Sequence, residues 1–86
     1  MIPIKPWKKL ADPDLNIYIR NFLGGGECAS ILNFTEDNDE RYRCSIRNSK
    51  IKNFYCIGKD VSMKWVDDKL IELGYRLLDE KYGSMI

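Results

Sequence analysis

The chain has 86 residues, of which 44 % are hydrophobic and 31 % are charged, and its formal net charge is +1. This length predicts one compact domain, residues 1–86, without space for a second hydrophobic core. The composition excludes intrinsic disorder, which requires low hydrophobicity with high net charge. No apolar run reaches the roughly 20 residues that cross a bilayer, so we expect no membrane partner.

The residue types narrow the chemistry further. Because the chain has no histidine, catalytic pairs of serine or cysteine with histidine and histidine metal ligands are excluded. Cys28, Cys44 and Cys56 form no CxxC pair, and their odd number argues against a disulfide framework. We therefore expect no metal, no cofactor and no enzymatic activity. The N-terminal prolines and lysines do not resemble a signal peptide, so a cytoplasmic location is predicted.

The first residues, 1–13, are predicted to form an ordered N-terminal arm. Pro6 suits the first turn of a short helix, in which Trp7 and Leu10 would close over an apolar edge. The PxxP spacing in this arm leaves a second interpretation open, namely a polyproline ligand for an SH3-like domain.

Residues 15–22, LNIYIRNF, alternate as in a strand. Leu15, Ile17 and Ile19 share one face, which we expect to be buried against a helix. The opposite, exposed face would carry Asn16, Tyr18, Arg20 and Phe22.

Three consecutive glycines, Gly24 to Gly26, follow this strand and raise the question of a phosphate-binding loop. Such loops need spaced glycines, or a Lys with Ser or Thr after the last glycine, and then a helix N-terminus. Here Glu27 follows, and its negative charge would repel an anion. We therefore expect a hairpin turn that requires positive φ.

Residues 27–34, ECASILNF, allow two interpretations. Alternate residues suit one face of a strand, whereas Cys28, Ile31 and Leu32 also suit a short helix. The shortness of the run favours the strand. The following segment, TEDNDE at 35–40, is predicted to be an acidic turn.

Residues 41–47, RYRCSIR, show the clearest strand pattern. Tyr42, Cys44 and Ile46 alternate with polar residues, which predicts one buried and one solvated face. After a short turn, residues 51–58 form another predicted strand, but their nearly continuous apolar character leaves either face as the buried one.

A C-terminal helix of about twenty residues is predicted to begin near Asp60 or Ser62 and to end at Gly83. The neighbouring acids Asp67 and Asp68 are expected on its solvated face. The elements together predict an α+β fold, an antiparallel meander of three to four strands with one long C-terminal helix packed on one face. The apolar stripe of this helix comprises Val66, Leu70, Leu73 and Leu77.

Positive charge is concentrated in residues 41–64, which carry seven basic and one acidic residue. We expect much of it on the sheet face opposite the helix, where the acidic residues 36–40 could neutralise part of it. Lysine and arginine neutralise phosphates and aromatic rings stack on bases, so single-stranded RNA or DNA is one candidate ligand. An acidic protein surface is another, and an ordinary solvated sheet face is the third explanation. This predicted basic face comprises Tyr18, Arg20, Arg41, Arg43, Arg47, Lys50, Lys52 and Phe54, with Asn53 and Tyr55 replacing Lys52 and Phe54 if the last strand has the opposite parity.

Trp65 and Tyr75 lie beside the apolar stripe of the predicted helix. Both suit the rim of a core, and both suit anchors for a protein partner, because Trp and Tyr dominate interface hot spots. We expect a small non-enzymatic regulator or inhibitor that binds a protein, such as a viral or mobile-element accessory factor. Nucleic-acid binding is the alternative function, and homo-oligomer formation is compatible with either.

Overall fold

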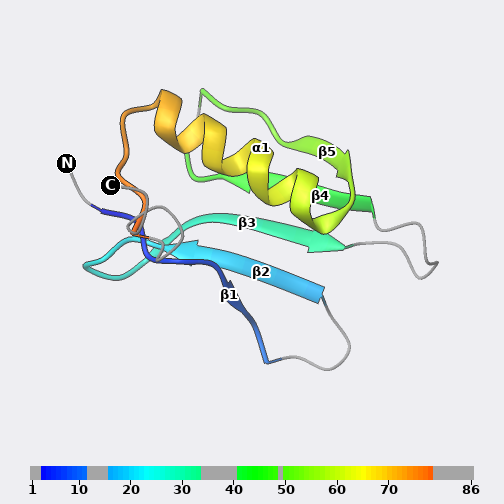
Figure 1. Cartoon of the computed structure of the whole chain (residues 1–86), viewed down its shortest axis with the longest axis horizontal. Coiled ribbons are helices and arrows are strands. Elements are labelled where there is room, and N and C mark those ends of the chain that lie inside the picture. The colour runs from blue at the N-terminus through cyan, green and yellow to red at the C-terminus, as the bar shows by residue number, and fades with distance from the viewer. Residues whose placement is uncertain (1–2, 12–15, 34–40, 49, 79–86) are drawn as a thin grey trace.

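The computed structural model of the protein describes residues 3–11, 16–33, 41–48 and 50–78. Five strands form one antiparallel sheet and follow one another in chain order across it. One helix lies across one face of the sheet, over its last three strands (Figure 1). The predicted α+β fold is confirmed, with one or two strands more than expected. The elements are β1 Lys8–Lys9, β2 Asn16–Asn21, β3 Glu27–Asn33, β4 Arg41–Ile46, β5 Phe54–Ile57 and α1 Lys59–Glu72.

The N-terminal arm is extended, so the short helix predicted from Pro6 is wrong. Ile4 forms a bridge to Phe22, and the two-residue strand β1 pairs with β2. A single helical turn is costly to nucleate, whereas an extended arm can use the hydrogen-bonding edge that β2 offers. The arm therefore becomes the first strand of the sheet.

The three glycines close the hairpin between β2 and β3, as predicted. The Phe22 N–H donates to the Gly26 carbonyl oxygen at 2.9 Å. The Gly25 N–H donates to the Phe22 carbonyl oxygen, also at 2.9 Å. Gly25 and Gly26 have φ angles of 106° and 89°, in the left-handed region that favours glycine. The register then shifts between Arg20 and Asn21, where β3 contains one extra residue, a β-bulge.

β3 is a strand over Glu27–Asn33, which decides between the two interpretations of this segment. It lies in the middle of the sheet, between β2 and β4. Ile31 is fully buried, and Leu32 on the opposite face is half-buried. Phe34 and the predicted acidic turn at 35–40 lie outside the described residues.

The helix α1 begins at Lys59, before both Asp60 and Ser62, near which the sequence predicted its start. Its first residue follows Gly58, which offers no side chain for capping. Ser62 lies within the first turn, where its hydroxyl donates to the Gly58 carbonyl oxygen at 2.7 Å. The predicted end at Gly83 lies outside the described residues. No helix in the described part of the chain is long and apolar enough to cross a membrane.

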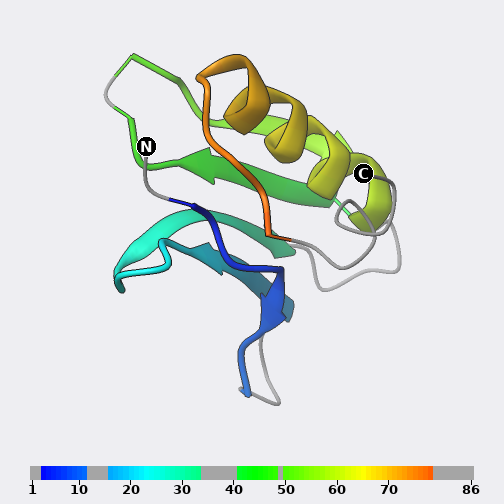
Figure 2. The same cartoon turned by 60° about the vertical axis from the view of Figure 1, so that its left-hand side comes forward.

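α1 is also shorter than predicted, with 14 residues instead of about twenty. Gly74 has a φ angle of 94° and reverses the chain after the last turn. The Tyr75 N–H then donates to the Leu70 carbonyl oxygen at 3.0 Å. Leu77 is therefore not on the helix; it forms a parallel bridge with Ile4, beside the N-terminal arm (Figure 2).

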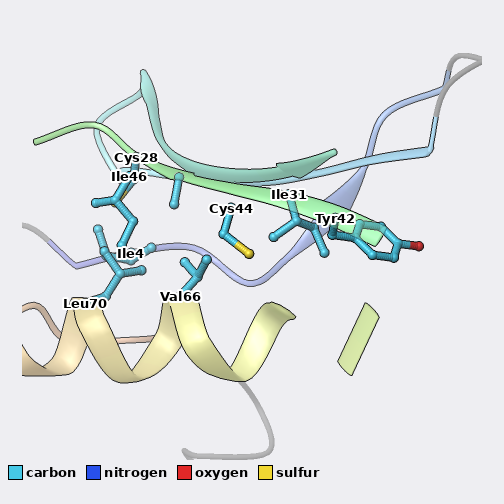
Figure 3. Close-up of a cluster of buried hydrophobic side chains, with 9 residues drawn as sticks. Ile4, Cys28, Ile31, Tyr42, Cys44, Ile46, Val66 and Leu70 are labelled. Atoms are coloured by element: carbon cyan, nitrogen blue, oxygen red, sulfur yellow. The ribbon is translucent and has the colours of Figure 1, made fainter. Parts of the chain in front are cut away.

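The hydrophobic core lies between the sheet and α1, as Figure 3 shows. The predicted alternation of β4 is confirmed, because Tyr42, Cys44 and Ile46 are all buried. Val66 and Leu70, one turn apart on α1, point at the sheet and are fully buried. The complete core comprises Ile4, Cys28, Ala29, Ile31, Tyr42, Cys44, Ile46, Val66 and Leu70.

Candidate functional site

The predicted basic face is formed only in part. Arg41 and Arg43 alternate with the buried residues of β4 and project, exposed, from the face of the sheet that α1 leaves open. Arg47, Lys50 and Lys52 are exposed in the connection between β4 and β5. Their pairing with the acidic segment that precedes β4 lies outside the described residues.

The prediction for β2 is wrong about which of its faces is buried. Tyr18 and Arg20 pair with β3 residues that are buried beneath α1. Because directly opposed residues of neighbouring strands share a face, Tyr18 and Arg20 lie on the α1 side. Ile17 and Ile19 consequently lie on the open face, and Leu15 is outside the described residues. Arg20 is therefore removed from the candidate binding residues.

Arg20 is fully buried because it forms an ion pair with Asp67 of α1. Its Nε donates to Asp67 Oδ1 at 2.9 Å and its Nη2 donates to Oδ2 at 3.4 Å. Its Nη1 donates to the Lys5 carbonyl oxygen at 2.7 Å. The Trp7 indole covers the pair, with its Nε1 donating to Asp67 Oδ1 at 3.1 Å and its ring centre 5.3 Å from Arg20 Cζ. This Arg20–Asp67 cluster joins β2, α1 and the N-terminal arm.

Tyr18 and Tyr75 are both engaged by contacts within the protein. The Tyr18 ring has Lys9 Nζ at 6.0 Å and Lys59 Nζ at 5.3 Å from its centre. The Tyr75 ring is tilted against Phe22, with 5.8 Å between the ring centres. Tyr18 is therefore not on the open face where it was predicted, and the role of Tyr75 as a partner anchor stays a prediction.

Phe54 lies on the α1 side of the sheet and Tyr55 on the open face. Of the two arrangements that the sequence allowed for this strand, the structure therefore has the one with Tyr55 on the open face. Phe54 pairs with the buried Cys44 across the strands. Its ring stacks on Trp65, with 4.8 Å between the ring centres and 7° between the planes. Trp65 is half-buried, and Lys69 Nζ lies 5.9 Å from its ring centre. These two rings form an aromatic pair at the rim between β5 and α1.

The open face of the sheet is more aliphatic than predicted. Ile17, Leu32, Arg43 and Tyr55 lie side by side in one cross-strand row. Ile17 and Leu32 are half-buried, and Tyr55 is the one aromatic residue that the described strands place on this face. The platform of several rings among arginines that the sequence predicted is therefore not formed by the described residues.

Exposed apolar side chains gather at β5 instead. Phe54, Tyr55 and Ile57 of this strand are 47 %, 59 % and 70 % exposed, and Val61 in the first part of α1 is 58 % exposed. These four residues, which we call the β5 edge, are among six large apolar side chains that are exposed in the described part of the chain. Single exposed apolar residues are common, so it is the concentration of three of them on one strand that makes the β5 edge the candidate surface.

Positive charge lies beside β5. Residues 41–57, which comprise β4, β5 and their connection, contain five basic residues and no acidic residue, and the first acidic residue after them is Asp60, next to Val61. Among them, Arg43 lies directly beside Tyr55 and Arg41 beside Ile57 on the open face. An apolar strand with an arginine-rich border resembles an interface in composition, because interfaces are enriched in aromatic residues and arginine.

The three cysteines are free thiols: Cys28 and Cys44 are buried, and Cys56 is half-buried. Burial raises the pKa of Cys28 to about 11, although the nearby Arg20 opposes this shift. Burial, and secondly the neighbouring Cys56, raises the pKa of Cys44 to about 12. Both thiols are therefore protonated, and their thiolates disfavoured, in the folded protein below pH 9.

We expect iodoacetamide at about pH 8.5 to modify Cys56 well before Cys28 and Cys44, since the thiolate is the reactive form. Mass spectrometry of proteolytic fragments measures the three rates, and the protein unfolded in urea is the control in which all three should react alike. Equal rates in the folded protein would contradict the burial of Cys28 and Cys44.

The pKa values of Cys28 and Cys44 are raised in the folded protein, so their protonated thiols contribute to the free energy of unfolding. This contribution is complete below pH 9 and should be lost as the pH rises toward 11 to 12.

No group of three or more cysteine, aspartate or glutamate side chains in the described residues is arranged to hold a metal ion. Comparison with known proteins finds no family model, no curated protein and no solved structure that matches this chain. Its function must therefore be inferred from its own surface, and among the described residues the β5 edge holds four of the six large apolar side chains that are exposed.

Proposed function

We propose that the protein is a small non-enzymatic regulator or inhibitor that binds a protein partner through the β5 edge. The observation that carries this proposal is the exposure of Phe54, Tyr55 and Ile57 on one strand. Burying such side chains is the main favourable contribution to protein association. Phe54 also stacks on Trp65, which extends this apolar surface onto α1. A partner that covered this edge would remove a large apolar area from water.

The open face supports a protein partner better than a nucleic acid. Single-stranded nucleic acids are bound by several rings on which successive bases stack, and this face offers Tyr55 among the described strands. Its other residues include the aliphatic Ile17, Ile19 and Leu32, which provide no stacking surface. The alternative, binding of single-stranded RNA or DNA, is favoured by the five basic residues of 41–57 and remains the competing hypothesis.

A displayed polypeptide library tests the proposal. Clones are selected on the folded protein and then measured on two variants with matched loss of apolar surface. The first, Tyr55→Ser with Ile57→Ser, removes side chains of the β5 edge. The second, Leu23→Ser with Ile71→Ser, removes exposed side chains elsewhere, which are 51 % and 53 % exposed. We expect the selected clones to lose at least about tenfold in affinity for the first variant and little for the second.

Two results would contradict the proposal. One is that the selected clones bind both variants equally well, because the β5 edge would then not be the preferred contact. The other is that no clone depends on this edge, whereas fluorescein-labelled single-stranded RNA or DNA of mixed sequence binds. If that binding weakens steeply with salt and is lost in Arg41→Ala with Arg43→Ala, the nucleic-acid hypothesis replaces the proposal.

A further inference from the structure

We infer that the partner binds as an extended acidic segment that adds a sixth strand to the sheet, paired with β5. This inference rests on the proposed function, because it assumes that the β5 edge contacts a protein. It goes further by naming the conformation and charge of the contacting segment. It also names the groups on this chain that recognise the segment, which are the backbone of β5 and the basic residues beside it.

The backbone of β5 provides the first reason. β5 is the last strand of the sheet and pairs with β4 on one side, and no described strand pairs with its other side (Figure 1). In an antiparallel strand, alternate residues direct their N–H and C=O groups to opposite sides. The outer side of β5 is therefore a template for strand addition, a common way in which sheets bind extended peptides.

The two edges of the sheet differ in a way that points to β5. The opposite edge is formed by the two-residue strand β1, which consists of Lys8 and Lys9, and by an arm that contains Pro3 and Pro6. Short strands, lysines and prolines are the features that protect an edge from unwanted pairing. β5 has neither a proline nor a charged residue between Phe54 and Ile57. The chain blocks one edge and leaves the other able to pair.

The side chains around β5 would select a segment with alternating residues. An added strand directs successive side chains to the two faces of the sheet. On the α1 side they would meet the stacked rings of Phe54 and Trp65. On the open face they would meet Tyr55 and Ile57, which lie beside the arginines of β4. Side chains of the added strand that point to the α1 side should therefore be apolar. Those that point to the open face should be acidic or apolar, because they meet both the arginines and the apolar residues there.

The positive charge of the hairpin formed by β4 and β5 determines which of the possible segments is expected to bind there. Residues 41–57 carry five basic and no acidic residues, so an acidic segment is complementary to them. A second copy of this chain, paired through β5, would bring two such basic hairpins together. Like charges that face each other disfavour this pairing, so an acidic partner is favoured over a homodimer.

A set of synthetic peptides of about eight residues, in which Val, Ile or Phe alternates with Asp or Glu, tests the inference. Titration calorimetry should find members that bind with a Kd below about 1 mM, and the same peptides with Lys in place of the acids should not bind. Amide hydrogen exchange followed by NMR is the deciding measurement. We expect amides of β5 that exchange rapidly in the free protein to be slowed by the bound peptide. The controls are two peptides that are N-methylated at every second residue, one at the odd and one at the even positions. The peptide whose methyl groups replace the N–H groups that pair with β5 should no longer slow the exchange of the β5 amides, whereas the other peptide should still slow it.

The outcomes separate this inference from the proposed function. If library clones need the β5 edge but acidic peptides bind without slowing any β5 amide, the partner contacts side chains only and strand addition is wrong. If no acidic peptide binds, or if the lysine peptides bind equally, the inference is overturned while the library result still decides the proposed function. If the free protein dimerises with protected β5 amides in light scattering and exchange experiments, the occupant is a second copy and the inference is also wrong.

Discussion

Asp67→Ala should lower the free energy of unfolding by about 3–5 kcal/mol, because it leaves the buried guanidinium of Arg20 without its carboxylate. Removing one partner of a buried ion pair costs more than the pair itself contributes, since the remaining charge stays out of water. Trp7 also loses the acceptor of its indole N–H. Urea unfolding followed by far-ultraviolet circular dichroism measures the effect, and avoids the fluorescence of the tryptophan that contacts Asp67.

The adjacent residue provides a matched control. Asp68 forms an ion pair with Lys64 at 2.8 Å, and both of these side chains are well exposed. Asp68→Ala should therefore change the free energy of unfolding by less than about 1 kcal/mol. The double variant Arg20→Met with Asp67→Leu should be more stable than Asp67→Ala alone, because it buries no unpaired charge. If Asp67→Ala costs no more than Asp68→Ala, the Arg20–Asp67 cluster does not stabilise the fold.

Leu70→Ala should lower the free energy of unfolding by about 2–5 kcal/mol, the range for a buried leucine that leaves a cavity. Leu70 is fully buried between α1 and the sheet. The loss combines the transfer of its apolar atoms with the contacts that the surrounding core side chains no longer make. Urea unfolding measures this difference, with the dependence of the free energy of unfolding on urea concentration expected to be the same for the variant and the unchanged protein.

Ile71 is the control for this second prediction. It follows Leu70 on the same helix and has a side chain of similar size, but it is 53 % exposed. Ile71→Ala should change stability by less than about 1 kcal/mol, because alanine also has the better helix propensity. Equal losses at the two positions would show that α1 is not packed on the sheet through Leu70.

The parts of the fold that the sequence predicted correctly are those that local patterns determine. The alternation of Tyr42, Cys44 and Ile46 in β4 identifies both the strand and its buried face. The glycines that require positive φ identify the hairpin between β2 and β3. Both signals act over a few neighbouring residues, so no distant partner is needed to interpret them.

The buried face of β2 was predicted wrongly because a distant residue decides it. Both faces of this strand carry apolar side chains, and the more apolar one was expected to be inside. Arg20 reverses this choice because Asp67, in a helix far along the chain, neutralises it. A signal was present: Asp67 lies beside Val66 and three residues before Leu70, at the border of the apolar stripe. An acid that is buried at that position needs a cation beside it, and Arg20 is the one basic residue between positions 10 and 40.

The candidate site was predicted in part, for the same reason. The arginines of β4 lie on the open face because β4 alternates strictly. The four residues of β5 are nearly all apolar, so their sequence allowed either parity, and only the pairing with β4 decides it. The β5 edge itself depends on which strand ends the sheet, and strand order is a property of the whole topology rather than of any segment.

The bridge between Ile4 and Leu77 has a consequence for how the protein folds during synthesis. The β2, β3 and β4 pairings join segments that follow one another along the chain, so they can form early and locally. Ile4 belongs to the core, yet one of its backbone partners comes from nearly the other end of the described chain. Closing so long a loop is entropically costly before the intervening strands are in place. We therefore expect the N-terminal arm to pair with β2 early, whereas Ile4 becomes fully enclosed only when residues 76–78 join it in a late step of folding.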